Sequence, residues 1–346
     1  QKTVLAVASL RTVDACLNED MLQGQPAPPA QGREAIREVR SQFSRAESLA
    51  IVGHFKEALT VATRAREQAE GVSDWPPLLA AALLHEGILL EKTGAFEQAE
   101  AASTRAYFAA SRSGAWDLAA NSAIDLIYIV GDRRARHAEG RVWAQHAEMA
   151  LVHAGDQLGV AEAQRLNNLA TVLMDSDAFA EALTLYERAL TIGERVLGPG
   201  DPNVSRTLGN LATVNMHMGA HAKAQALYER SLAIQEQTLG PGHPIVAHTL
   251  NNLAILRQIA GDYPEARRLY ERALAMREQA LGPDDPDVAG YLNNLATLLE
   301  TTGAYAEARA LHERGLAITQ RALGPDHPDV AQTLYNIATV HIATGA

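Results

Sequence analysis

The sequence predicts an all-α fold built as a solenoid of antiparallel helix pairs. The main observation is a fixed repeat, because four similar stretches begin at residues 197, 239, 281 and 323, which are 42 residues apart: LGPGDPNV, LGPGHPIV, LGPDDPDV and LGPDHPDV. Hydrophobic residues make up 47% of the chain and aromatic ones only 5%, which suits close-packed Ala/Leu helices better than β-sheets. A chain of 346 residues also exceeds the ~250–300 residues of a single core, whereas a linear array has no such limit.

The N-terminal part is expected to be less regular than the rest. Residues 1–33 predict one short helix followed by the Pro-rich linker QGQPAPPAQG, and residues 34–156 predict three divergent repeats. The turn sequences GHFKEAL at Gly53 and GAFEQAE at Gly94 each fit a helix pair. The third repeat, from Gly131, reaches its small residue Gly140 only after several extra residues, so a lengthened turn is expected there.

Residues 157–346 predict four regular 42-residue repeats and a terminal half-repeat. In one unit Leu250, Leu253 and Ala254 share a helix face, which indicates a first helix. Gly261 ends this helix where a left-handed residue is wanted, and Pro264 lies just inside the next helix, where its missing N–H costs nothing. The buried face of the second helix is formed by Ala266, Leu269, Tyr270, Ala273 and Leu274.

Small residues and rings recur at fixed places in the second helices. The small residues are Ala182, Ala224, Ala266 and Ala308, and the rings are Tyr186, Tyr228, Tyr270 and His312. Together with the turn glycines this pattern resembles the tetratricopeptide repeat, with its turn G-x-[FY]-x-x-A followed by A-x-x-x-[FY]. The resemblance implies a right-handed superhelical solenoid. The 42-residue step, LGPDHPDVA and TLNNLA resemble the repeats of kinesin light chains in particular.

The order of segments carries a second resemblance. A short SLRTVDACLNEDML segment, a Pro-rich linker, divergent repeats with IDLIYIVGDRRARHAEG and then regular repeats are similar to the C-terminal region of a family of bacterial serine/threonine protein kinases. No glycine-rich loop, HRD or DFG motif accompanies it. This resemblance implies a regulatory or substrate-recruiting region of a larger kinase. The missing initiator Met and the abrupt final HIATGA favour a fragment.

Charge and cysteine content restrict the partners. The formal net charge of −11 argues against a nucleic acid or an anionic membrane surface. The apolar run from Val4 to Leu10 is too short to span a bilayer. Cys16 is the sole cysteine, which favours a reducing, cytoplasmic location. No cofactor is expected, and no metal site, since no acidic or cysteine ligand is spaced to join His137, His146 and His153.

A polar ladder runs along the first helices of the regular repeats. One position is asparagine in every repeat, its predecessor is often asparagine, and a threonine commonly follows three residues later. Asparagine is roughly half a kcal/mol less favourable than alanine inside a helix, so five copies need a reason. With two charged residues near the helix starts, the candidate peptide-binding residues are Asn167, Asn168, Thr171, Arg206, Asn210, Thr213, His248, Asn251, Asn252, Asn293, Asn294, Thr297 and Asn336.

Two interpretations of the ladder stay open. Side-chain amides carry donors and an acceptor, so they can hold the backbone of an extended peptide without requiring one peptide sequence. The kinesin-light-chain resemblance implies this role for the five asparagines. Alternatively, each amide bonds to the neighbouring helix and fixes the spacing of the repeats.

The sequence therefore favours a non-catalytic module that binds a partner peptide or segment in its concave groove. No nucleophile, base and orienting group can be placed together, so no enzyme is expected. The alternative is a self-assembly or structural spacer module without a peptide ligand. No residue pattern identifies the partner.

The last half-repeat predicts weak self-association through the C-terminal end. Leu334, Ile337 and Ala338 are expected to dock on the preceding repeat, which would leave Val340 and Ile342 uncovered.

Overall fold

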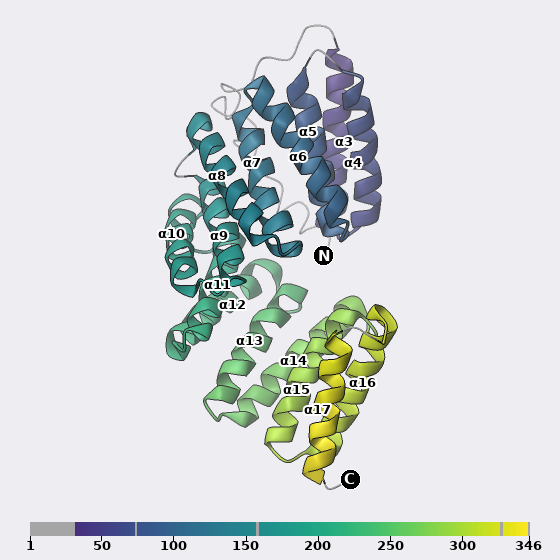
Figure 1. Cartoon of the computed structure of the whole chain (residues 1–346), viewed down its shortest axis with the longest axis vertical. Coiled ribbons are helices and arrows are strands. Elements are labelled where there is room, and N and C mark those ends of the chain that lie inside the picture. Colours follow the sequence, from purple (N-terminus) through teal and green to yellow (C-terminus); the bar gives the residue numbers. More distant parts are fainter. Residues whose placement is uncertain (1–31, 73–74, 157–158, 326–327, 345–346) are drawn as a thin grey trace. The chain divides into compact units, whose positions relative to one another are not determined.

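The computed structural model describes residues 32–72, 75–156, 159–325 and 328–344 (Figure 1). These residues form helices joined by short turns and contain no strand, which confirms the all-α prediction for the described part of the chain. The helix and linker expected before residue 32 lie outside it. The chain divides into two compact units, unit 1 ending at Gly198 and unit 2 beginning at Pro199.

Unit 1 consists of helix pairs in which each helix packs on the next. Its helices are α3 (Arg33–Ile51), α4 (Phe55–Glu70), α5 (Pro76–Lys92), α6 (Phe96–Ser113), α7 (Trp116–Leu126) with the π-helical η2 (Ile127–Arg133), α8 (His137–Ala154), α9 (Val160–Met174) and α10 (Phe179–Leu197). The first helix of each pair is α3, α5, α7 and α9.

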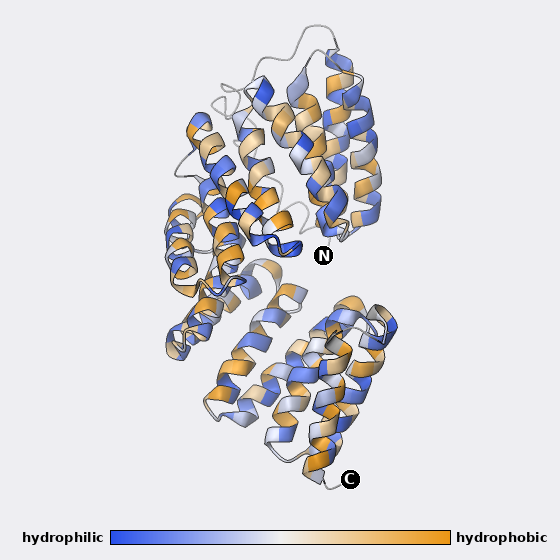
Figure 2. Cartoon of the chain, in the orientation of Figure 1, coloured by the Kyte–Doolittle hydropathy of each residue, from blue (hydrophilic) through white to orange (hydrophobic). Residues whose placement is uncertain are grey.

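Unit 2 repeats the same pairing with greater regularity. Its helices are α11 (Pro202–His217), α12 (His221–Leu239), α13 (Pro244–Ile259), α14 (Tyr263–Leu281), α15 (Pro286–Thr301), α16 (Tyr305–Leu323) and α17 (Pro328–Thr344). Hydrophobic and hydrophilic residues share the same helices, as expected for amphipathic helices that pack side by side (Figure 2). The antiparallel helix pairs predicted from the 42-residue step are thus present.

Caps and turn residues explain where the helices of unit 2 begin and end. Asp201, His243 and Asp285 each accept a hydrogen bond from the backbone N–H two residues later, and a proline follows each of them at the first helical position. The turn between paired helices needs a left-handed residue, and Gly261 supplies it with φ 80°.

An arginine bridge joins successive repeats of unit 2. Arg272 donates to Glu236 Oε1 at 2.7 Å, and Arg314 donates to Glu278 Oε1 at 2.6 Å and to the carbonyl of Pro283 at 2.8 Å. The acceptors belong to the second helix and the LGP connection of the preceding repeat. The bridge therefore gives the LGP connection a packing role.

The prediction of a lengthened turn at Gly131 is wrong. Gly131 is buried inside η2, and the left-handed turn residue is Ala135, with φ 50°. Ala135 precedes Gly140 by five positions, as Gly261 precedes Ala266, so the turn has its usual register. The extra residues lengthen the first helix, where they form the π-helical segment. A Cβ on Gly140 would lie 2.6 Å from the Cα of Gly131, so the two glycines permit a close backbone contact.

The docking face expected for the last helix is partly wrong. Val340, which was expected to stay uncovered, is buried together with Val330, whereas Leu334, which was expected to dock, is 48% exposed and Ala338 is also exposed. Helix α17 packs on α16 through the face that carries Val330 and Val340, which turns Leu334 outward. The expectation that Ile342 stays uncovered is confirmed, at 81% exposure.

Candidate functional site

The predicted ladder forms hydrogen bonds between first helices of unit 2. Asn294 Nδ2 on α15 donates to Asn251 Oδ1 on α13 at 3.0 Å. Asn293 Nδ2 lies 3.4 Å from Thr333 Oγ1 on α17, so a similar contact joins the next pair of first helices. These bonds match the interpretation in which the amides fix the spacing of the repeats.

A second set of bonds ties the ladder to the buried rings. The hydroxyls of Thr213 and Tyr228 lie 2.7 Å apart, and Asn252 also hydrogen-bonds to Tyr228. Burial raises the pKa of the Tyr228 phenol, although both hydrogen bonds oppose the shift. The phenol therefore stays neutral, and its hydroxyl can both donate and accept a hydrogen bond, which suits a link between helices.

The surface between α13 and α15 also contains a hollow of about 470 Å³. Asn294 and Thr297 line it from the ladder. Thr297 is exposed, and its hydroxyl donates to the carbonyl of Asn293 at 2.9 Å. The remaining lining residues are Ile255, Gln258, Ile259, Tyr263, Tyr270 and Thr301. The hollow therefore joins polar ladder groups to apolar side chains.

Sequence reasoning missed the apolar part of this hollow. Ile259 and Tyr263 flank the turn after α13, and both of these large hydrophobic side chains keep much of their surface exposed. In the sequence, the two large side chains on either side of Gly261 could have indicated the hollow. Large exposed apolar side chains that gather around a concavity indicate a binding surface. The helical periodicity of the sequence predicts only which side chains are buried.

Four other candidate residues of unit 2 lie on α11, α13 and α17. Arg206 on α11 and His248 on α13 are exposed. Asn210 is half-buried on α11, and Asn336 on α17 accepts a hydrogen bond from Gln332 Nε2 at 3.0 Å. The hollow between α13 and α15 contains none of these four residues, so it gathers only part of the predicted set.

In unit 1 the ladder residues are drawn into the scaffold. Asn168 Nδ2 on α9 donates to the carbonyl of Ile124 on α7 at 3.1 Å, and Asn167 is buried. The hydroxyl of Thr171 donates to the carbonyl of Asn167 at 3.1 Å and lies 2.9 Å from the hydroxyl of Tyr186. These groups link α7, α9 and α10.

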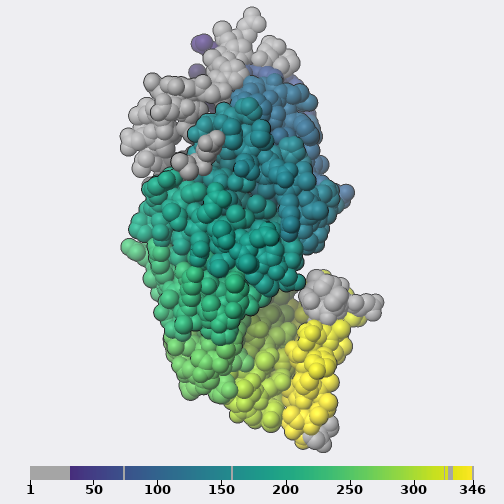
Figure 3. Space-filling model, turned by 60° about the vertical axis from the view of Figure 1, so that its left-hand side comes forward, coloured from purple at the N-terminus to yellow at the C-terminus, as the bar shows by residue number. Residues whose placement is uncertain are grey.

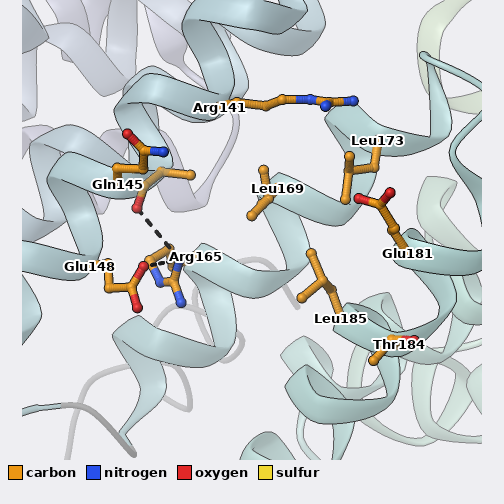
Figure 4. A pocket seen from close by; sticks show the side chains of 10 residues that line it. Arg141, Gln145, Glu148, Arg165, Leu169, Leu173, Glu181, Thr184 and Leu185 are labelled. Carbon is orange, nitrogen blue, oxygen red and sulfur yellow. Dashed lines mark hydrogen bonds and ion pairs between the residues drawn. The ribbon is translucent and has the colours of Figure 1, made fainter.

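A second hollow, of about 450 Å³, lies in unit 1 among α8, α9 and α10, whose surface is teal in Figure 3. Leu169, Leu173 and Leu185 give it an apolar lining, and Arg141 extends over it from α8 (Figure 4). Arg165 is buried and donates to Glu162 Oε2 at 2.6 Å. No sequence motif had indicated this hollow.

Two of the three histidines weighed as metal ligands have other contacts. His146 Nδ1 lies 3.0 Å from the hydroxyl of Tyr107, and His153 stacks on Trp116 with ring centroids 4.5 Å apart. Within the described residues no group of three His, Cys, Asp or Glu side chains is arranged to hold a metal ion. No described helix is long and apolar enough to cross a membrane.

Comparison with known proteins gives one family. The model of the tetratricopeptide repeat matches residues 160–215, 204–279, 249–321 and 287–346, which together span 160–346, or 187 of 346 positions. No curated protein matches the chain.

Solved structures add kinesin-light-chain-like neighbours. The crystal structure of BtubC (BKLC) from P. vanneervenii has a TM-score of 0.51 and 26% identity, and the match covers 61% of this chain and 84% of that one. Two crystal structures of a putative kinesin light chain from Podosopora anserina with nearly identical TPR-like repeats are also 26% identical, covering 54% and 88%, with TM-scores of 0.48 and 0.47.

Proposed function

The chain belongs to the tetratricopeptide repeat family, and from this premise we propose that it is a protein–protein interaction module that binds an extended segment of a partner along its first helices. The observation that carries the proposal is the hollow between α13 and α15, where Asn294 and Thr297 adjoin exposed apolar side chains. Extended peptides offer backbone donors and acceptors as well as side chains, and this surface can meet both.

The hydrogen bonds of the ladder leave capacity for a ligand. A side-chain amide has two N–H donors and an oxygen that can accept. The bond from Asn294 to Asn251 uses one donor of Asn294 and leaves its other donor and its oxygen. We therefore propose that Asn294 and Thr297 contact the peptide backbone, while Asn252 and Asn168 chiefly support the scaffold through their bonds to Tyr228 and Ile124. Peptide binding by the remaining candidate residues stays a prediction.

A charged residue placed in the hollow tests the proposal. Thr297→Arg should block the hollow without entering the buried core, and Ala275→Arg on the exposed side of α14 adds the same charge elsewhere. We would probe an array of immobilised peptides with the wild-type chain and both variants, and record circular dichroism of each. The proposal requires that Thr297→Arg loses peptides that the wild-type chain and Ala275→Arg retain. Identical peptide sets for all three, or no captured peptide, would contradict it.

We also propose that the module recruits substrates or regulators for an attached bacterial serine/threonine kinase in the cytoplasm. The support is the resemblance in segment order given by SLRTVDACLNEDML, the Pro-rich linker and IDLIYIVGDRRARHAEG. Sequencing the gene upstream of Gln1 tests this context, since it requires a kinase domain in the same reading frame.

Self-assembly remains the second candidate function, because α17 exposes apolar side chains. Leu334 is 48%, Tyr335 66% and Ile342 81% exposed on this helix. Burying apolar surface of this kind contributes about 25 cal/mol per Å². Light scattering against concentration tests this candidate, since a chain that remains monomeric at high concentration would exclude self-assembly.

A further inference from the structure

The ring position of the last complete repeat differs from the others. His312 on α16 is 0% exposed and occupies the place that Tyr270 takes one 42-residue step earlier. A fully buried imidazole needs partners for both ring nitrogens, because an unpaired buried polar atom is costly.

Both nitrogens of His312 face oxygen atoms. Nδ1 lies 2.9 Å from Asn293 Oδ1, and Nε2 lies 2.7 Å from Glu300 Oε1. The Asn293 amide nitrogen lies 3.4 Å from Thr333 Oγ1, and the amide oxygen lies toward the ring. An ionised carboxylate and an amide oxygen are acceptors only, so this arrangement is satisfied when each ring nitrogen carries a hydrogen. The geometry calls for the doubly protonated, positively charged imidazolium.

Comparison within the chain shows that two residues change together. Tyr270 donates its hydroxyl to Gln258 Oε1 at 3.1 Å, and one step later the same two places hold His312 and Glu300. The earlier pair is neutral. The later pair brings a titratable ring and a carboxylate into the same kind of buried contact.

The surroundings supply no second counter-charge for the ring among the contacts of the described residues. The elements packed most closely on α16 are α15, which presents Glu300, and α17, which presents the uncharged Thr333 through Asn293. Helix α14 also reaches α16, where its Arg267 pairs with Glu307 and its Glu278 pairs with Arg314. On α16 itself, Glu313 is paired with Arg309, and Arg314 is engaged in the arginine bridge to Glu278. Glu300 is therefore the group on which the charged ring depends.

We propose that His312 is a proton-dependent lock that holds α15, α16 and α17 together. With both nitrogens protonated, the ring joins Glu300 and Asn293, and Asn293 extends the connection to Thr333 on α17. Loss of one proton leaves an acceptor without its donor and loosens the last repeat. The lock does not depend on the proposed peptide binding, although Asn293 belongs to the predicted ladder and would lose its fixed position with the lock open.

Nuclear magnetic resonance of the full chain tests the protonation state directly. Ring ¹⁵N shifts of the twelve histidines would be measured, with His312 assigned by the signal lost in His312→Tyr. The proposal expects a proton on each ring nitrogen of His312 in the locked state. A single-proton ring under the same conditions would overturn it.

Hydrogen exchange tests the consequence. Protection factors of α16 and α17 amides in the wild-type chain should fall about tenfold between pH 6 and pH 9, after correction for intrinsic exchange. The double variant His312→Tyr with Glu300→Gln recreates the Tyr270 and Gln258 pair and should show no such fall. Equal pH dependence in the two proteins would refute the lock, and Glu300→Gln alone provides the same comparison if the double variant does not fold.

Discussion

Replacing Asp125 with asparagine should make the chain more stable at alkaline pH. Asp125 lies near the end of α7, and its Oδ2 is buried without a hydrogen-bond partner among the described residues. Burial raises the pKa of this carboxyl to about 7, the charge of Glu91 raises it further, and Lys92 opposes the shift. A neutral asparagine of nearly the same shape removes the cost of ionisation and keeps the packing.

The size of the effect follows from the difference in pKa between the folded and unfolded chain. A value of about 7 in place of 3.8 corresponds to about 4 kcal/mol of lost stability once both states are ionised. Below about pH 3.8 both states are protonated and the cost vanishes, so stability is lost as the pH rises from there to about 7. Asp125 is not covered completely, and water reaching it reduces the cost to about 2 kcal/mol.

The assay is urea unfolding of the wild-type chain, Asp125→Asn and a control, Asp117→Asn on the first turn of the same helix. At about pH 4, where the cost has almost vanished, the wild type and Asp125→Asn should be close in stability. At about pH 8.5 the variant should be more stable by about 1 to 2 kcal/mol, and Asp117→Asn should not show this gain. An Asp125→Asn variant that is equally or less stable at about pH 8.5 would refute the reasoning about the buried carboxyl.

Three further predictions follow from packing, bridging and exposure. Gly140→Ala should destabilise unit 1 by about 2 to 3 kcal/mol in urea unfolding, because the added Cβ would meet backbone atoms. As a control, Gly290→Ala, whose added Cβ has nothing within 4 Å, should stabilise unit 2 by about 0.5 kcal/mol. Arg314→Ala should cost about 1 kcal/mol by the same assay, and Arg268→Ala, which loses only a bond to its own helix, should cost less. Ile342→Glu should abolish any concentration-dependent association seen by light scattering, and association that persists would place the contact elsewhere.

The helices were predictable because their signals are local. The apolar spacing of Leu250, Leu253 and Ala254, the proline at 264 and the glycine at 261 act within a few residues of the structure they determine. The same signals recur at each 42-residue step, so each predicted helix boundary is supported by several repeats of the same chain. The fold class and the pairing of helices could be predicted for this reason.

The sequence-based predictions failed where one residue type can serve two purposes. A glycine can supply a left-handed turn or permit two backbones to meet, and only the structure shows that Gly131 does the second while Ala135 adopts the left-handed conformation. The face on which α17 docks was equally ambiguous, because apolar residues surround most of that helix. Sequence periodicity cannot rank such faces when the pattern has no polar side.

The ladder shows a limit of another kind, since an amide's partner depends on the neighbouring repeat. Asn252 is bonded to a tyrosine and Asn168 to a backbone carbonyl, although both occupy the same place in the repeat. The hollow between α13 and α15 likewise depends on Ile259 and Tyr263, which lie on either side of a turn. Its existence follows from how two helices meet and not from either helix alone.

The two roles of the ladder need not compete. An amide held by one hydrogen bond to a neighbouring helix loses rotational freedom before a ligand arrives, so binding costs less side-chain entropy. The bond from Asn294 to Asn251 fixes the plane of the Asn294 amide, and its remaining donor and oxygen then have set directions. Thr297, which donates to a carbonyl of its own helix, still has an oxygen that can accept. Scaffold bonds of this kind would prepare a surface for the proposed extended segment, so the spacing role is compatible with the proposed binding role at the same residues.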